Sequence, residues 1–491
     1  MTAVTSTSLT GASATEIASM VRNGAATATD VLEAALARVD ALDDTLHAFV
    51  ERTDSAARER AAETDAAISR GERVGPLAGV PIAIKDLIAT AGVPTRNGSV
   101  AYADWTPEED DIVVERVKKA GAIIIGKTTV PEFGYSGVGH NPISPTARNP
   151  WDPALTPGGS SAGSAVAVAT GMTPLALGSD GGGSVRIPAA LCGLVGFKAS
   201  MGRVPLYPGC RDERYPGVSS WETLEHIGPI TRTVADAALL MSVIAGPDLR
   251  DRHSLPAGDV AWTECVGQGA AEKIRGMRIA YSPDLGYLPV DPQVRDVVGD
   301  AVGAFTALGA SVTRVDPWLE DSRRYVWPLV MADTDLVGMR RMVAEYGDRM
   351  SPHLVDLVER QWTAEDFTTA QVARKRVVNQ MARLMSDYDL LLTPTLAVPA
   401  FPVGMQGPEI IDDQMVDAGS WLGFLNIFNM TGQPAISVPA GFTEDALPVG
   451  LQIVGRHLCD GDVLAAAAAF EGIRPWRGLW PATAGERGLQ G

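Results

Sequence analysis

Cysteine and histidine are scarce in this sequence. Its 491 residues include four cysteines and six histidines. The cysteines show no CxxC spacing and have no neighbouring histidine at metal-ligand spacing. We therefore expect no metal site, and reduced thiols without a catalytic role at Cys192, Cys210, Cys265 and Cys459.

Positive charge is in the minority, with 41 basic against 59 acidic residues and a net charge of −18. Phosphates would be repelled over most of the surface, which argues against nucleic acid or an anionic membrane as a partner. The N-terminus lacks the basic and apolar regions of a secretory signal, and the long uncharged stretch 154–179 is too rich in small residues for a membrane span. We expect a cytoplasmic protein with a small-molecule partner, and a homodimer stays open.

Helix and strand patterns alternate along the chain. A capping box at Ser13–Glu16 and a helix opening at Thr27 predict an N-terminal helical hairpin. "GVPIAIKD" predicts a short apolar strand that ends at Lys85, and "DDIVVERVKKAGAIIIGKT" predicts a helix, a glycine stop and a strand. Late strands are predicted in "YDLLLTPTLAVPA" and "QPAISVPAGFTEDALPVGLQIVGR". This alternation indicates an α/β fold with a mixed central sheet covered by α-helices on both sides.

Residues 318–388 look helical and lack the strand alternation seen elsewhere. We predict a helical elaboration there, near the entrance to a site. No internal repeat or long linker interrupts the chain, so one domain over residues 1–491 fits better than several.

Two familiar motifs match in their letters but not in their context. Residues 121–128 satisfy the phosphate-loop pattern GxxxxGK[ST], yet the variable positions Ala-Ile-Ile-Ile predict a buried strand rather than an open turn. Residues 159–163 satisfy GxSxG, a nucleophile elbow centred on Ser161, but three prolines precede it where an elbow requires a strand. The context argues against a nucleotide site and against an elbow nucleophile.

A third motif, "GSDGGGSVR" at residues 178–186, places three consecutive glycines before a serine. Residues without a Cβ can turn their N–H groups towards one point and let a substrate carbonyl approach the backbone closely. The loop is therefore a candidate oxyanion hole, made by Gly181, Gly182, Gly183 and Ser184.

Three segments in combination resemble the amidase signature family: "GVPIAIKDLIAT", "TPGGSSAGSAVAV" and "GSDGGGSVRIPAALCGLVGFK". They occur in the usual order and spacing, and a weaker resemblance extends over almost the whole chain. The resemblance implies an amidase-signature fold with its core signature region at about 75–235. It also implies a Ser-cisSer-Lys catalytic unit that needs no cofactor.

The matching positions are Ser184 as nucleophile, Ser160 as the bridging serine in a cis peptide, and Lys85 as base. Asp180 and Arg186 match family positions that hold the glycine loop in place. Lys85 can act as a base only if its ammonium loses its proton part of the time, which desolvation at an apolar strand end would favour. The neighbouring Asp86 would oppose this if it faced Lys85, although successive strand side chains point to opposite faces.

The sequence departs from the family pattern at Gly181, where the family usually has threonine. Loss of that side chain leads us to expect a more mobile loop and a locally larger pocket. Catalysis should survive, because the expected contribution at this position is a backbone N–H.

The implied reaction is attack of Ser184 on a carbonyl, followed by hydrolysis of the acyl-enzyme by water. Candidate pocket residues are Tyr135, Tyr207 and Phe424, for which, as for Trp327, core packing is the alternative interpretation. These candidates are neutral, so we predict hydrolysis of small uncharged amides, aryl or aliphatic, together with esters and carbamates (urethanes) of similar shape. Two alternatives stay open: an amidotransferase A-type subunit that hydrolyses glutamine for a protein partner, and a non-enzymatic binding module.

Overall fold

The computed structural model describes residues 9–208, 221–258, 260–317 and 319–485, and a mixed sheet of eleven strands runs through this part of the chain. The strand order is β1-β3-β2-β4-β6-β5-β12-β13-β9-β7-β8. β2 pairs in parallel with β3 and β4, and β7 with β8 and β9, whereas the remaining pairs are antiparallel. The strands are β1 (Phe49–Arg52), β2 (Pro81–Lys85), β3 (Ile123–Thr128), β4 (Leu175–Ser179), β5 (Val195–Lys198), β6 (Ile227–Thr231), β7 (Arg278–Tyr281), β8 (Ser311–Arg314), β9 (Leu390–Pro394), β12 (Ala435–Phe442) and β13 (Pro448–Gly455). A separate small hairpin joins β10 (Ile410–Ile411) to β11 (Gln414–Met415).

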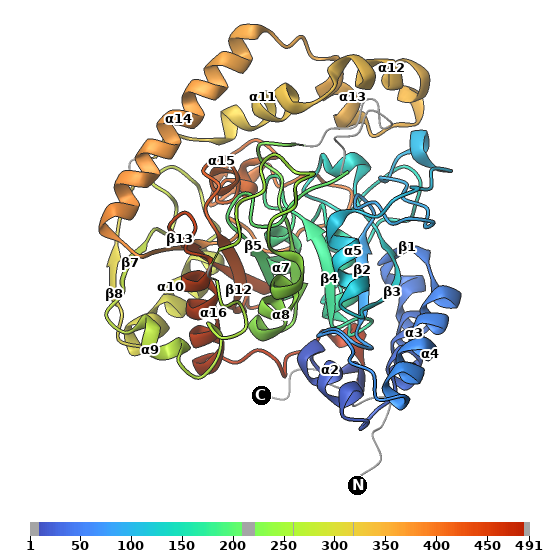
Figure 1. The fold of residues 1–491 in the computed structure, drawn as a ribbon. Helices are drawn as coiled ribbons and strands as arrows, with labels where there is room; N and C mark the ends of the chain where they lie inside the picture. Colours follow the sequence, from blue (N-terminus) through green and yellow to red (C-terminus); the bar gives the residue numbers. More distant parts are fainter. Residues whose placement is uncertain (1–8, 209–220, 259, 318, 486–491) are drawn as a thin grey trace.

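Helices pack on both faces of this sheet (Figure 1). α6 and α7 contact each other and one face, while α8, α10 and α16 pack on the other. The architecture confirms the predicted α/β fold with a mixed central sheet. The helices are α2 (Ala14–Arg22), α3 (Ala28–Leu46), α4 (Asp54–Ser69), α5 (Ile112–Lys119), α6 (Ala162–Ala169), α7 (Arg186–Cys192), α8 (Val234–Ile244), α9 (Ala270–Ile274), α10 (Pro292–Ala307), α11 (Arg323–Asp333), α12 (Leu336–Tyr346), α13 (Pro352–Glu359), α14 (Ala364–Asp387), α15 (Asn426–Met430) and α16 (Asp460–Ile473).

The local sequence signals correspond to these elements. Ser13 and Glu16 form the predicted capping box at the start of α2, and Thr27 accepts the Asp30 N–H at the start of α3. The apolar run that matched the phosphate-loop pattern is β3, which lies inside the sheet between β1 and β2. Its amides are therefore committed to strand pairing rather than open to a phosphate.

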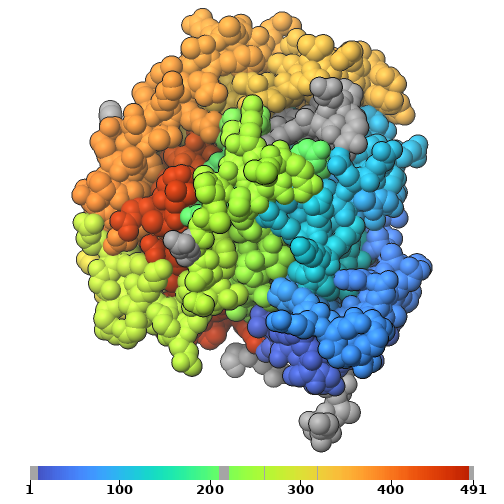
Figure 2. Space-filling model, in the orientation of Figure 1, coloured from blue at the N-terminus to red at the C-terminus, as the bar shows by residue number. Residues whose placement is uncertain are grey.

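The segment predicted to be a helical elaboration forms α11 to α14. These helices lie across one end of the molecule, opposite the two termini (Figure 1), and give that end a continuous yellow and orange surface (Figure 2). A second hydrophobic cluster lies beneath them, apart from the main core of the sheet. It joins Leu329 and Met339 of the helices to Tyr135 and Trp221, which come from loops of the sheet.

The register of the sheet brings two strand ends together. β2 and β4 are parallel neighbours in which Ile84 lies opposite Leu177, so Lys85 and Ser179 end these strands at the same edge. The carboxyl edge of parallel strands is where α/β proteins commonly form their sites.

The described cysteines form no disulfide bond. Cys192, Cys265 and Cys459 are free thiols, whereas Cys210 lies outside the described residues. No helix in the described ranges combines the length and apolar character needed to cross a bilayer.

Candidate active site

Lys85 is fully buried at the end of β2, and its amine is held by two serines. Nζ donates to Ser160 Oγ at 2.7 Å, to Ser179 Oγ at 2.8 Å and to the Ser179 carbonyl at 3.1 Å. Lys85 and Ser160 are 75 residues apart in sequence, so only the fold brings them together. The contacts place the lysine amine and the Ser160 hydroxyl in direct hydrogen-bond contact.

Asp86 points away from Lys85, as the alternation of strand side chains predicted. Its carboxylate lies 3.9 Å from the Lys127 Nζ and accepts the Arg96 N–H. Burial raises the pKa of the Asp86 carboxyl to about 7, against the opposing effect of the Lys127 ammonium. The Asp86 carboxyl thus interacts with other groups on the opposite face of β2.

Ser160 is also buried, and the Gly159–Ser160 peptide bond is cis. A side chain at position 159 would place its Cβ 2.7 Å from the Val138 carbonyl, so the close approach requires glycine there. The next residue, Ser161, is fully buried, and its hydroxyl donates to the Ser179 carbonyl. No strand occurs in residues 150–160, as the prolines predicted, so the strand–turn–helix geometry of a nucleophile elbow is missing here.

Ser184 lies in the glycine loop between β4 and α7 and lines a cavity. Its carbonyl accepts the Ser161 N–H at 3.3 Å, which places the glycine loop directly beside the Ser160–Ser161 segment. The chain therefore brings Lys85, Ser160 and Ser184 into one region at the carboxyl ends of β2 and β4.

The glycine-loop amides fall into two groups. The Gly183 N–H donates to Asp180 Oδ1 at 2.7 Å, so it is committed to the loop's own support. Gly183 also has a φ of +114°, a conformation that other residues rarely adopt. Among the described residues, the N–H groups of Gly181, Gly182 and Ser184 meet no acceptor. Of the four expected oxyanion donors, Gly183 therefore serves the loop itself.

Asp180 and Arg186 form a fully buried ion pair behind the loop. Arg186 donates to both carboxylate oxygens of Asp180 at 2.9 Å. It also donates to Gln452 Oε1 and Asn429 Oδ1, each at 2.7 Å. Burial alone would raise the pKa of the Asp180 carboxyl, but the Arg186 charge and hydrogen bonds hold that pKa well below its usual range. The pair therefore stays charged and fixes the loop that carries Ser184.

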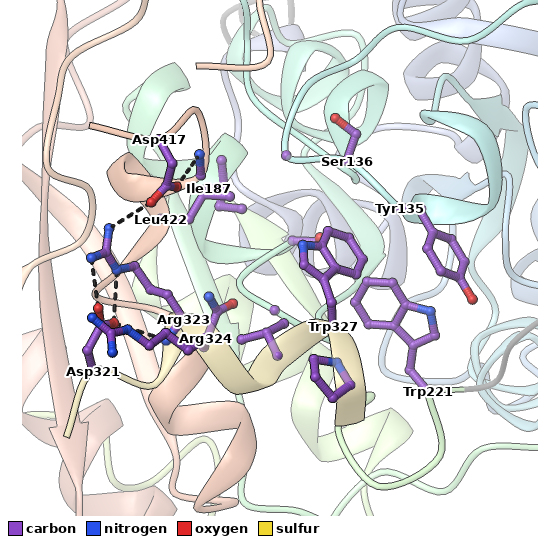
Figure 3. Close-up of a pocket in the computed structure, with 18 of the residues that line it drawn as sticks. Tyr135, Ser136, Ile187, Trp221, Asp321, Arg323, Arg324, Trp327, Asp417 and Leu422 are labelled. Carbon is purple, nitrogen blue, oxygen red and sulfur yellow. Dashed lines mark hydrogen bonds and ion pairs between the residues drawn. The ribbon is translucent and has the colours of Figure 1, made fainter. Parts of the chain in front are cut away.

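The cavity in front of Ser184 has a volume of about 450 Å³ and two chemically different ends (Figure 3). Aromatic side chains form one end, and charged side chains form the other. Arg323 is already paired, since it donates twice to Asp321 at 2.8–2.9 Å and lies 3.7 Å from Asp417. The expectation of a neutral lining therefore describes only the aromatic end. The aromatic end includes Tyr135, Trp221 and Trp327, the charged end includes Asp321, Arg323, Arg324 and Asp417, and Arg360 also lines the cavity.

Of the sequence-predicted pocket residues, Tyr135 and Trp327 line the cavity, whereas Tyr207 and Phe424 do not. Phe424 is fully buried in the main core. The Tyr207 ring lies under the Arg250 guanidinium, 5.3 Å from its Cζ. The structure favours the packing interpretation for these two residues, because neither side chain reaches the cavity.

The space left by the missing side chain at Gly181 is filled rather than open. An ideal Cβ at this position would lie 2.2 Å from Cε3 of Trp221. The expectation of a locally larger pocket is therefore wrong, since the Trp221 indole occupies that volume.

Sequence reasoning missed Ser179, Trp221 and the charged end. Ser179 stands directly before Asp180 in the glycine segment, so its position at a strand end was a usable signal. Trp221 and Arg323 belong to other parts of the chain and carry no local signal that links them to Ser184.

The chain is similar to known proteins over most of its length. A family model described as Amidase matches residues 30–464. An acylamidase of Rhodococcus erythropolis is 38% identical over 482 residues, which cover 96% of this chain and 97% of that protein. The A-type subunit of the glutamyl-tRNA(Gln) amidotransferase of Chloroflexus aurantiacus is 35% identical over 480 residues, 92% of this chain and 94% of that protein. The crystal structure of a bacterial aryl acylamidase of the amidase signature family matches with a TM-score of 0.88 at 32% identity, covering 97% of this chain and 99% of that one.

These matches define the class as a hydrolase that acts on carbon–nitrogen bonds of linear amides. The chain belongs to the amidase signature family.

Proposed function

We propose that this protein hydrolyses small neutral amides, aryl or aliphatic, through an acyl-enzyme on Ser184. The observation that carries the proposal is the 2.7 Å contact of the buried Lys85 amine with the Ser160 hydroxyl, beside a loop whose serine faces a cavity. Neutral Lys85 accepts a proton from Ser160 as Ser160 accepts one from Ser184, which then attacks the substrate carbonyl. The same path returns the proton to the leaving amine, and water hydrolyses the ester that remains.

The negative charge that develops on the substrate oxygen needs donors already in place. The N–H groups of Gly181, Gly182 and Ser184 are the candidates, because no acceptor among the described residues uses them. Asp180 supports them indirectly by holding the Gly183 and Val185 amides at 2.7 and 3.3 Å.

The preference for a neutral group rests on the aromatic end of the cavity. A carboxylate placed against Tyr135 and Trp221, both largely shielded from water, would lose much of its hydration. Esters and carbamates should react as well, since the same attack applies to carbonyls with an oxygen leaving group. We further propose a cytoplasmic location, a small molecule rather than nucleic acid or a membrane as partner, and no cofactor.

Glutamine hydrolysis for a partner protein is the second candidate, favoured by the 35% identity to an A-type amidotransferase subunit. Arg323 at the charged end is already paired with Asp321, which argues against its holding a glutamine carboxylate, whereas Arg324 and Arg360 also line the cavity. The higher identity to an acylamidase also favours the amidase.

The test compares kcat/KM, at one pH and ionic strength, for neutral anilides, primary amides, esters and carbamates with that for glutamine and carboxylate-bearing peptides. Ser184→Ala serves as the background control, and labelling by a serine-directed fluorophosphonate, followed by peptide mapping, checks the nucleophile. We expect neutral amides to be preferred and the label on Ser184. A clear preference for glutamine would instead support the amidotransferase function, and a folded protein that neither labels nor hydrolyses would support a binding module.

A further inference from the structure

Trp221 and Gly181 form a matched pair at the aromatic end of the cavity. The missing Cβ of Gly181 leaves room for the indole, because a Cβ there would lie 2.2, 2.9 and 3.1 Å from three ring carbons of Trp221. Contacts below 3.0 Å essentially never occur for real Cβ atoms. The backbone of Gly181 does not adopt a positive φ, so the close approach of the ring is the physical reason for glycine at this position.

The indole of Trp221 cannot easily move aside. Its ring packs edge-on against Tyr135 at a centroid distance of 5.1 Å and against Trp327 at 6.3 Å. Figure 3 shows the three side chains grouped together. Its carbonyl accepts the N–H groups of Leu224 and Glu225, which fixes the turn that carries it.

The same turn is tied to the helices above the cavity. Asp333 of α11 accepts both the N–H and the hydroxyl of Thr223 at 2.9 Å. Arg374 of α14 donates to the hydroxyl and the carbonyl of Thr223 at 2.8 and 2.7 Å. The position of Trp221 is therefore set both by the glycine loop below it and by the helices above it.

We propose that Trp221, seated on Gly181, is a specificity-determining residue that limits the size of the substrate group lying beside the glycine loop. The indole lines the same cavity as Ser184. A flat single ring can pack edge-to-face or offset against this wall, whereas a fused or branched group meets the indole. This inference rests on the proposed function, since it names the part of the site that selects the amide.

The pairing makes a specific prediction about single and double variants. Gly181→Ala forces the indole into the cavity or displaces the loop, and either change should lower kcat/KM for small anilides by about 10–100-fold. Trp221→Ala should raise the ratio of kcat/KM for bulky over small substrates by about 10-fold or more. In the double variant the added methyl group has room, so most of the loss caused by Gly181→Ala should be absent.

Trp327 supplies the matched control. It lines the same cavity, but the three atoms nearest to a Cβ at Gly181 all belong to Trp221. Trp327→Ala loosens the packing of the Trp221 indole but leaves the indole in place, so in combination with Gly181→Ala it should restore less of the lost kcat/KM than Trp221→Ala does.

The experiment measures kcat/KM for the 4-nitroanilides of acetic, butyric and benzoic acid, which vary the acyl group. It also measures kcat/KM for the acetamides of aniline and naphthylamine, which vary the amine. A size limit on either group is therefore detected. Fluorophosphonate titration of Ser184 counts functional sites in each variant. Thermal unfolding of the same variants gives a readout that does not depend on activity: Gly181→Ala should lower the Tm in the presence of Trp221 and not in its absence. If Gly181→Ala does not fold, its combination with Trp221→Phe replaces it.

Additive effects of Gly181→Ala and Trp221→Ala on both Tm and kcat/KM would overturn the proposal, as would an unchanged size preference in Trp221→Ala. A wild-type protein that fails to label or to hydrolyse any amide would overturn the proposed function instead. In that case coupled Tm values would still support the packing of Trp221 on Gly181, and additive Tm values would overturn it.

Discussion

Removal of the Arg186 guanidinium is a direct test of how the glycine loop is held. Arg186 and Asp180 are both fully buried, and the arginine donates to both carboxylate oxygens. In Arg186→Met the Asp180 carboxylate loses its cationic partner while it stays buried. Breaking a buried pair in this way costs about 3–5 kcal/mol. At an unfolding entropy of about 2.1 cal/mol/K per residue, the chain of 491 residues should lose about 3–5 °C in Tm.

The loss in Tm of Arg186→Met should be larger at high pH than at low pH. In the wild type the pKa of Asp180 lies below its unfolded value, so the stability that it contributes is present above about pH 4 and is lost only at lower pH. Without Arg186, burial raises the folded pKa of Asp180 above the unfolded value, so the folded variant takes up a proton more readily than the unfolded chain. The deficit in Tm should therefore be largest near pH 7.5 and smaller near pH 5.

The assay is differential scanning calorimetry at both pH values. It compares the wild type, Arg186→Met and the double variant Asp180→Asn/Arg186→Met. The double variant removes both charges and should recover part of the Tm, with little dependence on pH. Anilide hydrolysis should fall in Arg186→Met beyond the loss in folded protein, because Asp180 also holds the Gly183 amide. A Tm equal to that of the wild type at pH 7.5, or a deficit that grows as the pH falls, would refute the reasoning.

Three further predictions concern the serines and the lysine. Ser160→Ala should lower kcat by about 10²–10⁴-fold, because the hydroxyl in contact with Lys85 is lost. The control Ser161→Ala should lower kcat much less. A larger loss in Ser161→Ala than in Ser160→Ala would restore the nucleophile elbow as a hypothesis. Lys85→Ala should remove most activity in a pH–rate profile between about pH 7 and 9, and normal rates there would show that another group is the base. Ser179→Ala should lower kcat by only about 3–10-fold, because Lys85 keeps the Ser160 hydroxyl and the Ser179 carbonyl as acceptors. A loss as large as that of Ser160→Ala would assign the proton transfer to the Ser179 hydroxyl.

The sequence by itself determined the elements and the identity of the candidate reacting groups. Helix starts at Ser13 and Thr27 followed from capping side chains, and the buried strand at residues 123–128 followed from the run of isoleucines with which it begins. These are local effects, since a cap or a hydrophobic period acts within a few residues. The candidates Lys85, Ser160 and Ser184 came from three motifs whose combined spacing resembles a known family.

Only the tertiary structure decided which groups meet and what surrounds them. The register of β2 against β4 turns Lys85 towards Ser179 and leaves Asp86 facing Lys127. The charge at one end of the cavity and the indole at the other come from residues far from the glycine loop in sequence. Trp221 fills the space above Gly181 because a turn held by two distant helices keeps it there, and no pattern within either segment contains that contact. Packing between distant segments therefore decided the shape of the site, whereas local patterns and motif spacing determined which chemical groups it contains.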